Sequence, residues 1–190
     1  MTVGAGSLLV VTGPPGAGKT TVARLLAEGA EPSVCIEADW FRTTIVTGGI
    51  PPWEAAADAQ NRTVLRAVVA AAARMVGGGF ATVVEGIVGP WHLELVRDEL
   101  APAATTVDYV VLRPDLATCI RRAAGRAGDE RVPGHPALTD EGAVTAMWRS
   151  FADLGRFEDQ VIDSTELTVE ETAEGVRELV SRGAGSLGAP

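Results

Sequence analysis

The chain has 190 residues, of which 46% are hydrophobic and 22% charged, so it can form a packed core and general disorder is excluded. The formal net charge of −9 argues against a general nucleic-acid binder, and no apolar run approaches the roughly 20 residues that cross a bilayer. Two cysteines are too few for a disulfide framework or a zinc site. We therefore expect a cytoplasmic protein without nucleic-acid or membrane partners, present as a monomer or homodimer.

Short apolar strands alternate with helical stretches along the chain, a pattern that predicts a parallel sheet covered by helices. Five segments have the length and apolar character of buried strands: Ser7–Thr12, Val34–Glu37, Ala81–Glu85, Thr106–Leu112 and Gln160–Asp163. The predicted fold class is a three-layer α/β/α sandwich with a five-stranded parallel sheet. One domain is expected over residues 1–182, followed by a flexible tail over residues 183–190.

Helices are expected between these strands, and several have recognisable caps. The first follows Gly18 and ends at Gly29, and residues 38–52 form a loop or a broken helix. The later helices are expected over Glu54–Met75, over Trp91–Leu100, from a cap at Asp115 to about Arg126, from a cap at Thr139 to near Gly155, and from a capping box of Thr168 and Glu171 to Gly183. Residues 127–138 are polar and rich in glycine and proline, which predicts a mobile loop.

Residues 13–20 read Gly-Pro-Pro-Gly-Ala-Gly-Lys-Thr and match the phosphate-binding loop pattern G-x-x-x-x-G-K-[ST] in full. Glycines let backbone N–H groups wrap the phosphates closely, and the following helix adds the positive end of its dipole. The lysine contributes a compact charge to the β- and γ-phosphates, and the threonine hydroxyl binds Mg²⁺. The residues expected to bind ATP here are Gly13, Pro14, Pro15, Gly16, Ala17, Gly18, Lys19, Thr20 and Thr21.

Lys19 is the only lysine among 16 basic residues. A guanine-specific GTPase needs a second lysine in its N-K-x-D motif, so ATP is the expected phosphate donor. Schiff-base chemistry away from this loop is excluded for the same reason. The sequence also lacks the G-x-S-x-G and H-E-x-x-H motifs of hydrolases and zinc proteases.

Two acidic residues follow neighbouring strands, at the sheet edge where open parallel sheets bind their ligands. Glu85 closes the third strand, where an acid can hold Mg²⁺, although it can equally sit in water or cap the turn at Gly86. Asp39 follows the second strand and can orient an acceptor hydroxyl and take its proton. Alternatively, Asp39 caps a helix that begins at Trp40, and Glu37 is a rival base that faces the opposite way in an alternating strand.

Arginines gather between positions 113 and 131 of this acidic chain. Arg122 and Arg126 are spaced i,i+4, so they share one helical face that leads into the glycine- and proline-rich loop. We expect a lid over about residues 122–138, with Arg126 neutralising the transferred phosphate, although a solvated basic face has the same pattern. Arg121 points elsewhere on the helix.

Aromatic residues cluster in the segments that follow the second and third strands. They can hold a partly apolar small molecule or belong to the core, and they are Trp40, Phe41, Trp53 and Trp91. Arg42 and Arg62 are the few cations nearby, and Gln60 and Asn61 offer hydrogen-bonding groups. The residues expected to face the acceptor are Asp39, Arg42, Trp53, Glu85 and Trp91.

This combination of strand, phosphate loop, Asp39 and the Arg122–Arg126 pair resembles the small P-loop kinases over about residues 7–182. Within them it is most similar to chloramphenicol phosphotransferase-like proteins, zeta-toxin-like proteins and the small AAA-type ATPase family, and more distantly to gluconate and shikimate kinases. The resemblance implies that Asp39 is the base on the acceptor hydroxyl. It also implies that Arg122 and Arg126 contact adenine and phosphate, and that Thr165 lies in the loop beside the adenine.

The sequence thus predicts a kinase that transfers the γ-phosphate of MgATP to a hydroxyl of a small molecule, such as an antibiotic or another metabolite. A zeta-toxin-like or nucleotide-directed kinase is an alternative, but a phosphorylated acceptor would require more cations than Arg42 and Arg62. A regulatory ATPase switch is a second alternative, which would need a surface for a partner. An RNA-end kinase is disfavoured because the chain carries a net negative charge, which would repel RNA.

Overall fold

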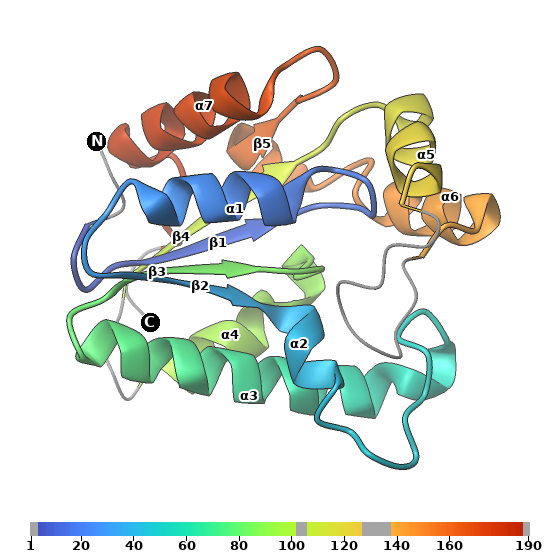
Figure 1. The fold of residues 1–190 in the computed structure, drawn as a ribbon, viewed down its shortest axis with the longest axis horizontal. Coiled ribbons are helices and arrows are strands. Elements are labelled where there is room, and N and C mark those ends of the chain that lie inside the picture. Colours follow the sequence, from blue (N-terminus) through green and yellow to red (C-terminus); the bar gives the residue numbers. More distant parts are fainter. Residues whose placement is uncertain (1–3, 102–105, 127–137, 188–190) are drawn as a thin grey trace.

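The computed structural model describes residues 4–101, 106–126 and 138–187. Five strands form one wholly parallel sheet in the order β2-β3-β1-β4-β5 (Figure 1). The strands are β1 (Leu8–Thr12), β2 (Ser33–Glu37), β3 (Ala81–Glu85), β4 (Val107–Leu112) and β5 (Val161–Ile162). The predicted three-layer α/β fold with five parallel strands is therefore confirmed, with the fifth strand shorter than expected.

Helices cover both faces of the sheet, as parallel strands require. Figure 1 shows α1 and α7 on one face, α3 and α4 on the other, and α5 and α6 beyond the carboxyl ends of the strands. The helices are α1 (Lys19–Glu28), α2 (Ala38–Arg42), α3 (Asp58–Gly77), α4 (Leu93–Leu100), α5 (Leu116–Ala124), α6 (Glu141–Ser150) and α7 (Val169–Ser181). Within the described ranges, no helix combines the length and apolar character needed to span a bilayer.

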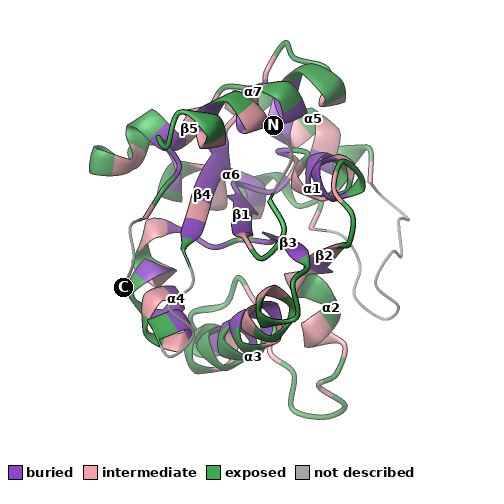
Figure 2. Cartoon of the chain, turned by 90° about the vertical axis from the view of Figure 1, so that its left-hand side faces the viewer, coloured by how far each residue is buried: buried purple, intermediate pink, exposed green. Residues whose placement is uncertain are grey.

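Alternate residues of β1 supply two cores, because successive side chains of a strand point to opposite faces. Leu8 and Val10 belong to the cluster formed with α3 and α4, whereas Leu9 and Val11 belong to the cluster formed with α1 and α7. Figure 2 shows these buried strands between helices whose outer surfaces are exposed. The site at the end of the sheet therefore stands on a rigid, doubly covered support.

Several boundaries differ from the sequence-based expectations. The helix expected from Glu54 begins at Asp58 after a 3-10 turn, and α6 ends at Ser150, well before Gly155. The N-cap of α6 is Asp140, whose carboxylate accepts a hydrogen bond from the Ala143 amide at 2.7 Å, so the expected cap at Thr139 is wrong.

The capping box of Thr168 and Glu171 at the start of α7 is confirmed, as is the Asp115 cap of α5. The first residues of the expected tail, which begins at Gly183, are held against the sheet, because the Tyr109 amide donates to the Gly185 carbonyl at 2.8 Å. Most of the expected lid, residues 127–137, lies outside the described residues.

The cap of α6 is testable by matched substitutions of neighbouring exposed residues. Asp140→Ala should lower the free energy of unfolding by about 1 kcal/mol, because the Ala143 amide loses its acceptor. Thr139→Ala should change it by a few tenths of a kcal/mol at most. Urea unfolding of both variants measures the difference, and equal losses would contradict the assignment of Asp140 as the cap.

Candidate nucleotide and acceptor site

The phosphate loop joins β1 to α1 in a conformation that depends on its glycines. Gly13, Gly16 and Gly18 have φ values of 145°, 79° and 88°, which side-chain-bearing residues rarely adopt. A Cβ atom on Gly13 would lie 2.0 Å from the Leu112 carbonyl oxygen. Gly18 caps α1 without any side-chain hydrogen bond, so the first amides of this helix are available to an anionic ligand.

Lys19 begins α1 and reaches back over the loop. Its ammonium donates to the Pro14 carbonyl at 3.0 Å, which holds the charge against the loop. Desolvation lowers the pKa of this ammonium, and the nearby carboxylates of Glu85 and Asp39 oppose that shift. The charge that phosphate oxygens would meet is therefore partly dehydrated and close to two acids.

Thr20 and Glu85 form the corner beside this lysine. The Thr20 hydroxyl donates to Glu85 Oε1 at 3.2 Å, although the two residues lie 65 positions apart. Glu85 is only 4% exposed, and burial raises its pKa to about 7, against the opposing effects of Lys19 and of the Thr20 hydrogen bond. Glu85 is therefore buried against Thr20 and does not sit in open solvent, and its expected contact with Mg²⁺ stays a prediction.

This corner fits Mg²⁺ held together with a nucleotide. In the described part of the chain, no group of three or more His, Cys, Asp or Glu residues could hold a metal by itself. Magnesium typically keeps several waters and binds through one or two protein oxygens plus substrate phosphates. The hydroxyl of Thr20 and the carboxylate of Glu85 offer that kind of donor set.

The two acids after β2 have different surroundings. Glu37 pairs in register with Glu85, but its Oε1 accepts from both Nε and Nη2 of Arg24, so its charge is already matched. Asp39 lies in the first turn of α2 and is 71% exposed, with Arg42 Nε at 3.6 Å from its Oδ1. Because α2 begins at Ala38 without a side-chain cap, Asp39 does not cap a helix from Trp40.

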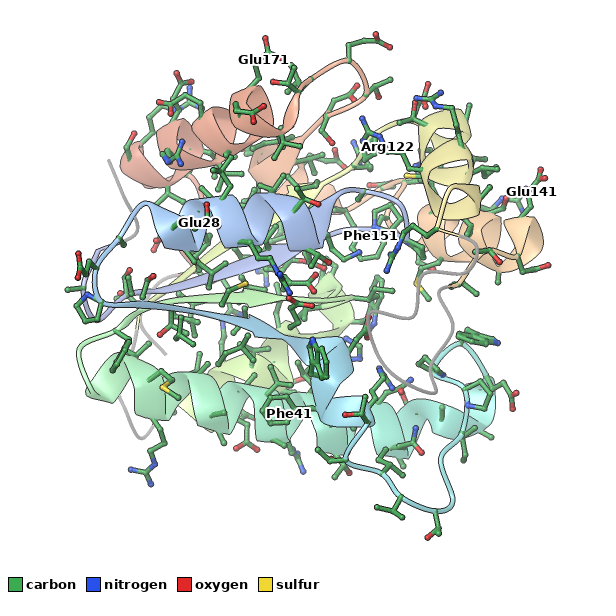
Figure 3. All side chains as sticks on the ribbon, in the orientation of Figure 1. Glu28, Phe41, Arg122, Glu141, Phe151 and Glu171 are labelled. Carbon is green, nitrogen blue, oxygen red and sulfur yellow. The ribbon has the colours of Figure 1, made fainter. Side chains whose placement is uncertain are left out.

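A cavity of about 340 Å³ lies between the phosphate loop, α5 and the start of α7. Arg122 and Arg126 line it, and Arg122 Nη2 donates to the carbonyl oxygens of Ser164 and Thr165 at 3.3 and 3.4 Å. Figure 3 shows Arg122 on the side of α5 that faces the segment before α7. The walls of this cavity also include Leu167, a residue that no sequence motif indicates.

Thr165 itself is not among the residues lining this cavity. Its hydroxyl donates to Asp163 Oδ1 at 2.5 Å and accepts from the Asp115 amide at 2.8 Å, so it joins β5 to the start of α5. Ser164 lies on the wall instead, 2% exposed, and its hydroxyl has no hydrogen-bond partner within the described residues. Ser164, one residue before the expected Thr165, therefore lines this cavity.

The expected acceptor residues are only partly brought together. Arg42 donates to Asn61 Oδ1 at 2.8 Å, and Asn61 Nδ2 donates to the Pro52 carbonyl at 2.8 Å. Gln60 likewise bonds both the amide and the carbonyl of Ile50. These amides therefore clamp the loop after α2 onto α3, a structural role that the sequence left open.

The exposed tryptophans are spread over different segments. Trp91 is half exposed, and the centroid of its ring lies 5.4 Å from that of Phe151. Its indole also packs against Gly89, where an added Cβ atom would lie only 2.2 Å from the ring. Trp53 is equally exposed, on the clamped loop. Neither residue lines the cavity beside the phosphate loop, so their expected contact with an acceptor stays a prediction.

The comparison with protein families matches residues 8–154 to the family described as AAA domain. No curated protein matches the chain. Among solved structures, one similar chain is part of an RNA repair complex, at a TM-score of 0.57 and 15% identity; the match covers 77% of this chain but only 44% of that one.

Other similar structures match over nearly their whole length. The tunicamycin resistance protein of Deinococcus radiodurans has a TM-score of 0.63 at 18% identity, covering 92% of this chain and 95% of that chain. The APS kinase of Mycobacterium tuberculosis has a TM-score of 0.63 at 21% identity, covering 94% and 99%. A gluconokinase from Sinorhizobium meliloti has a TM-score of 0.59 at 19% identity, covering 94% and 95%. At these identities the likeness establishes the fold.

Gly86, the residue that follows β3, packs closely against Ala38 in the first turn of α2. A Cβ atom on Gly86 would lie 2.8 Å from Ala38 Cβ, so Gly86→Ala should displace the first turn of α2 and cost about 1–3 kcal/mol of unfolding free energy. Ala38→Gly in the same chain should recover most of that overpacking cost, and Gly49→Ala, whose Cβ meets only an ordinary 3.7 Å contact, is the control. Additive losses in a double-mutant cycle would contradict the proposed contact.

The buried Glu85 predicts a pH dependence of stability in the absence of magnesium and nucleotide. Its folded pKa of about 7 exceeds the ordinary 4.5, so the folded protein binds the extra proton and this stabilising contribution is lost as the pH rises through that range. Glu85→Gln lacks the effect, so its stability relative to wild type should increase by up to roughly 3 kcal/mol between pH 4.5 and 7.5.

Chemical unfolding across that pH range measures this difference, with Glu94→Gln on the exposed face of α4 as the charge-matched control. A difference between wild type and Glu85→Gln that does not change with pH would contradict the raised pKa of Glu85.

Proposed function

Because the chain belongs to the AAA domain family, with a complete phosphate loop at the end of its sheet, we propose that it is a phosphotransferase. In this proposal it moves the γ-phosphate of MgATP to a hydroxyl group of a small molecule. The observation that carries the proposal is the exposed carboxylate of Asp39 within electrostatic reach of Lys19 and Glu85. A protein that only binds or hydrolyses ATP has no need of such a carboxylate on the open side of the site.

The nucleotide half of the site is built from the phosphate loop and α1. Backbone amides at the start of α1 and the Lys19 ammonium would hold the phosphates, and the cavity beside Arg122 would take the base. Thr20 and Glu85 would hold Mg²⁺, which would supply charge neutralisation at the phosphates. The absence of a second lysine for guanine recognition favours ATP over GTP.

Asp39 is the preferred base because its rival Glu37 is engaged. Arg24 binds Glu37, whereas Asp39 is 71% exposed and forms a looser ion pair with Arg42, at 3.6 Å. In the reaction the acceptor oxygen would bond to the γ-phosphorus as the bond from phosphorus to the β–γ bridging oxygen breaks and ADP leaves. Asp39 would orient the hydroxyl and receive its proton, while Arg126 would balance charge on the transferred group.

The similar structures agree with a hydroxyl acceptor but do not select one. They include proteins described as a gluconokinase, an APS kinase and a tunicamycin resistance protein. A phosphorylated acceptor would need cations near Asp39, and Arg42 is already bound to Asn61. We therefore favour an acceptor without a phosphate group, such as an antibiotic or another metabolite.

The proposal is tested by ADP release with MgATP across a panel of hydroxylated metabolites and antibiotics. At least one acceptor should stimulate wild-type turnover, and Asp39→Asn should lose about 100-fold or more of the stimulated rate while still binding ATP. Asp98→Asn on α4, an exposed acid of the same type, should leave the rate unchanged. Lys19→Ala should remove turnover with every acceptor.

Two results would count against this assignment. Acceptor-stimulated turnover that survives Asp39→Asn would mean that another group orients the hydroxyl. ATP turnover in wild type that responds to no hydroxylated compound would favour a regulatory ATPase over a metabolite kinase.

A further inference from the structure

His92 is a half-buried titratable residue that the proposed reaction does not use. It ends the segment that leads from Glu85, at the carboxyl end of β3, into α4, and it closes a short 3-10 turn over Pro90–His92. Figure 1 shows that this segment, α2 and the start of α3 lie at the same edge of the sheet. His92 therefore stands on the side of the site where the acceptor is expected.

Two buried hydrogen bonds hold this segment against the sheet. The Val88 amide donates to Thr12 Oγ1 at 2.9 Å, and the Tyr109 hydroxyl donates to the Val88 carbonyl at 2.8 Å. Thr12 directly precedes the phosphate loop, and Leu93, the residue after His92, is 2% exposed in the core beside α3 and α4. The backbone on both sides of His92 is thus fixed relative to the phosphate loop, as a residue that positions a substrate requires.

The imidazole of His92 contains an unmatched polar atom. Its Nδ1 atom is buried and has no hydrogen-bond partner within the described residues. A buried polar atom without a partner is costly, and native proteins rarely leave one unpaired. A leucine would fill the same space without that cost. The unpaired nitrogen therefore indicates a group from outside the chain that completes the hydrogen bond.

The surroundings of this imidazole favour its neutral form. Burial lowers the pKa of His92, and the guanidinium groups of Arg62 on α3 and Arg42 on α2 lower it further, whereas the Asp58 carboxylate opposes them. At neutral pH, one ring nitrogen therefore donates a hydrogen bond and the other accepts one. Such a ring suits an uncharged hydroxyl or amide group, because each of these groups can also donate or accept.

Arg42 connects His92 with the proposed base. Its Nε atom lies 3.6 Å from Asp39 Oδ1, and its charge also acts on the imidazole. Trp91 is half exposed, and the centroid of its ring lies 5.8 Å from that of His92. A carboxylate for the reacting hydroxyl, an aromatic surface and a neutral hydrogen-bonding ring therefore belong to one neighbourhood at this edge of the sheet.

We infer that His92 is a specificity residue for the acceptor, an inference that rests on the proposed kinase function. Nδ1 of its neutral imidazole forms a hydrogen bond with an uncharged hydroxyl or amide group of the acceptor, while a different hydroxyl of the same molecule meets Asp39. The indole of Trp91 contacts the carbon skeleton between these groups. The acceptor class is thus a molecule that carries, besides the reacting hydroxyl, a second and uncharged hydrogen-bonding group.

Steady-state ADP release with MgATP and a stimulating acceptor tests this role, with variants that replace one ring nitrogen at a time. An asparagine amide reaches the position of Nδ1, whereas a glutamine amide reaches that of Nε2. His92→Leu and His92→Gln should raise the KM for the acceptor about tenfold and leave kcat and the KM for ATP nearly unchanged, because a binding contact is lost. His92→Asn should stay within about threefold of wild type.

Imidazole ¹⁵N NMR spectra, recorded with a non-hydrolysable MgATP analogue and the same panel of hydroxylated compounds, give a readout that needs no turnover. The chain has only two histidines, so the signals of His92 are those that His92→Asn lacks. A bound acceptor should shift the Nδ1 signal of His92 in wild type and in Asp39→Asn alike.

An acceptor KM that is unchanged in His92→Leu, or raised equally in His92→Asn, would overturn the inference and leave the proposed function standing. A panel in which no compound shifts the Nδ1 signal would overturn it as well. A compound that shifts this signal without stimulating ADP release would support binding at His92 and count against the proposed phosphotransfer.

Discussion

The hydrogen bond between Thr20 and Glu85 is the contact around which the site is organised. It joins the first turn of α1 to the end of β3, at 3.2 Å, although 65 residues separate the two groups. Only a sheet order that places β3 directly beside β1 allows it. Lys19 and Asp39 come within electrostatic reach of Glu85 for the same reason, because the carboxyl ends of β1, β2 and β3 meet at one edge.

The parts of the fold that the sequence predicts are those determined by local chemistry. Glycine, lysine and threonine at fixed spacing define the phosphate loop, and apolar runs between turn residues define the strands, of which Ala81–Glu85 is recovered residue for residue. The Thr168 capping box is equally local. The order of the strands requires long-range pairing, and the sequence analysis does not provide it.

Side-chain environments are harder to predict, because distant elements determine them. Alternation along β2 disfavours Glu37 as the base, yet what engages it is Arg24 from α1. Gln60 and Asn61 clamp a loop that comes before them in the chain. Ser164 lines the cavity by the phosphate loop, whereas the Thr165 hydroxyl bonds back to Asp115 and Asp163. None of these contacts leaves a periodic signal in the sequence.

The distribution of charge differs between the phosphate-loop side and the α2 side of the candidate site. Three arginines of the described part of the chain already have partners. Arg24 pairs with Glu37, and Arg113 pairs with Glu158. Arg42 contacts both Asp39 and Asn61. The cations that line the cavity beside the phosphate loop are Lys19, Arg122 and Arg126. Around α2 the exposed groups are instead a carboxylate and an indole, Asp39 and Trp40. Because negative charge and aromatic surface repel phosphate and attract cations, this side of the site suits a neutral or amine-bearing molecule better than a phosphorylated one.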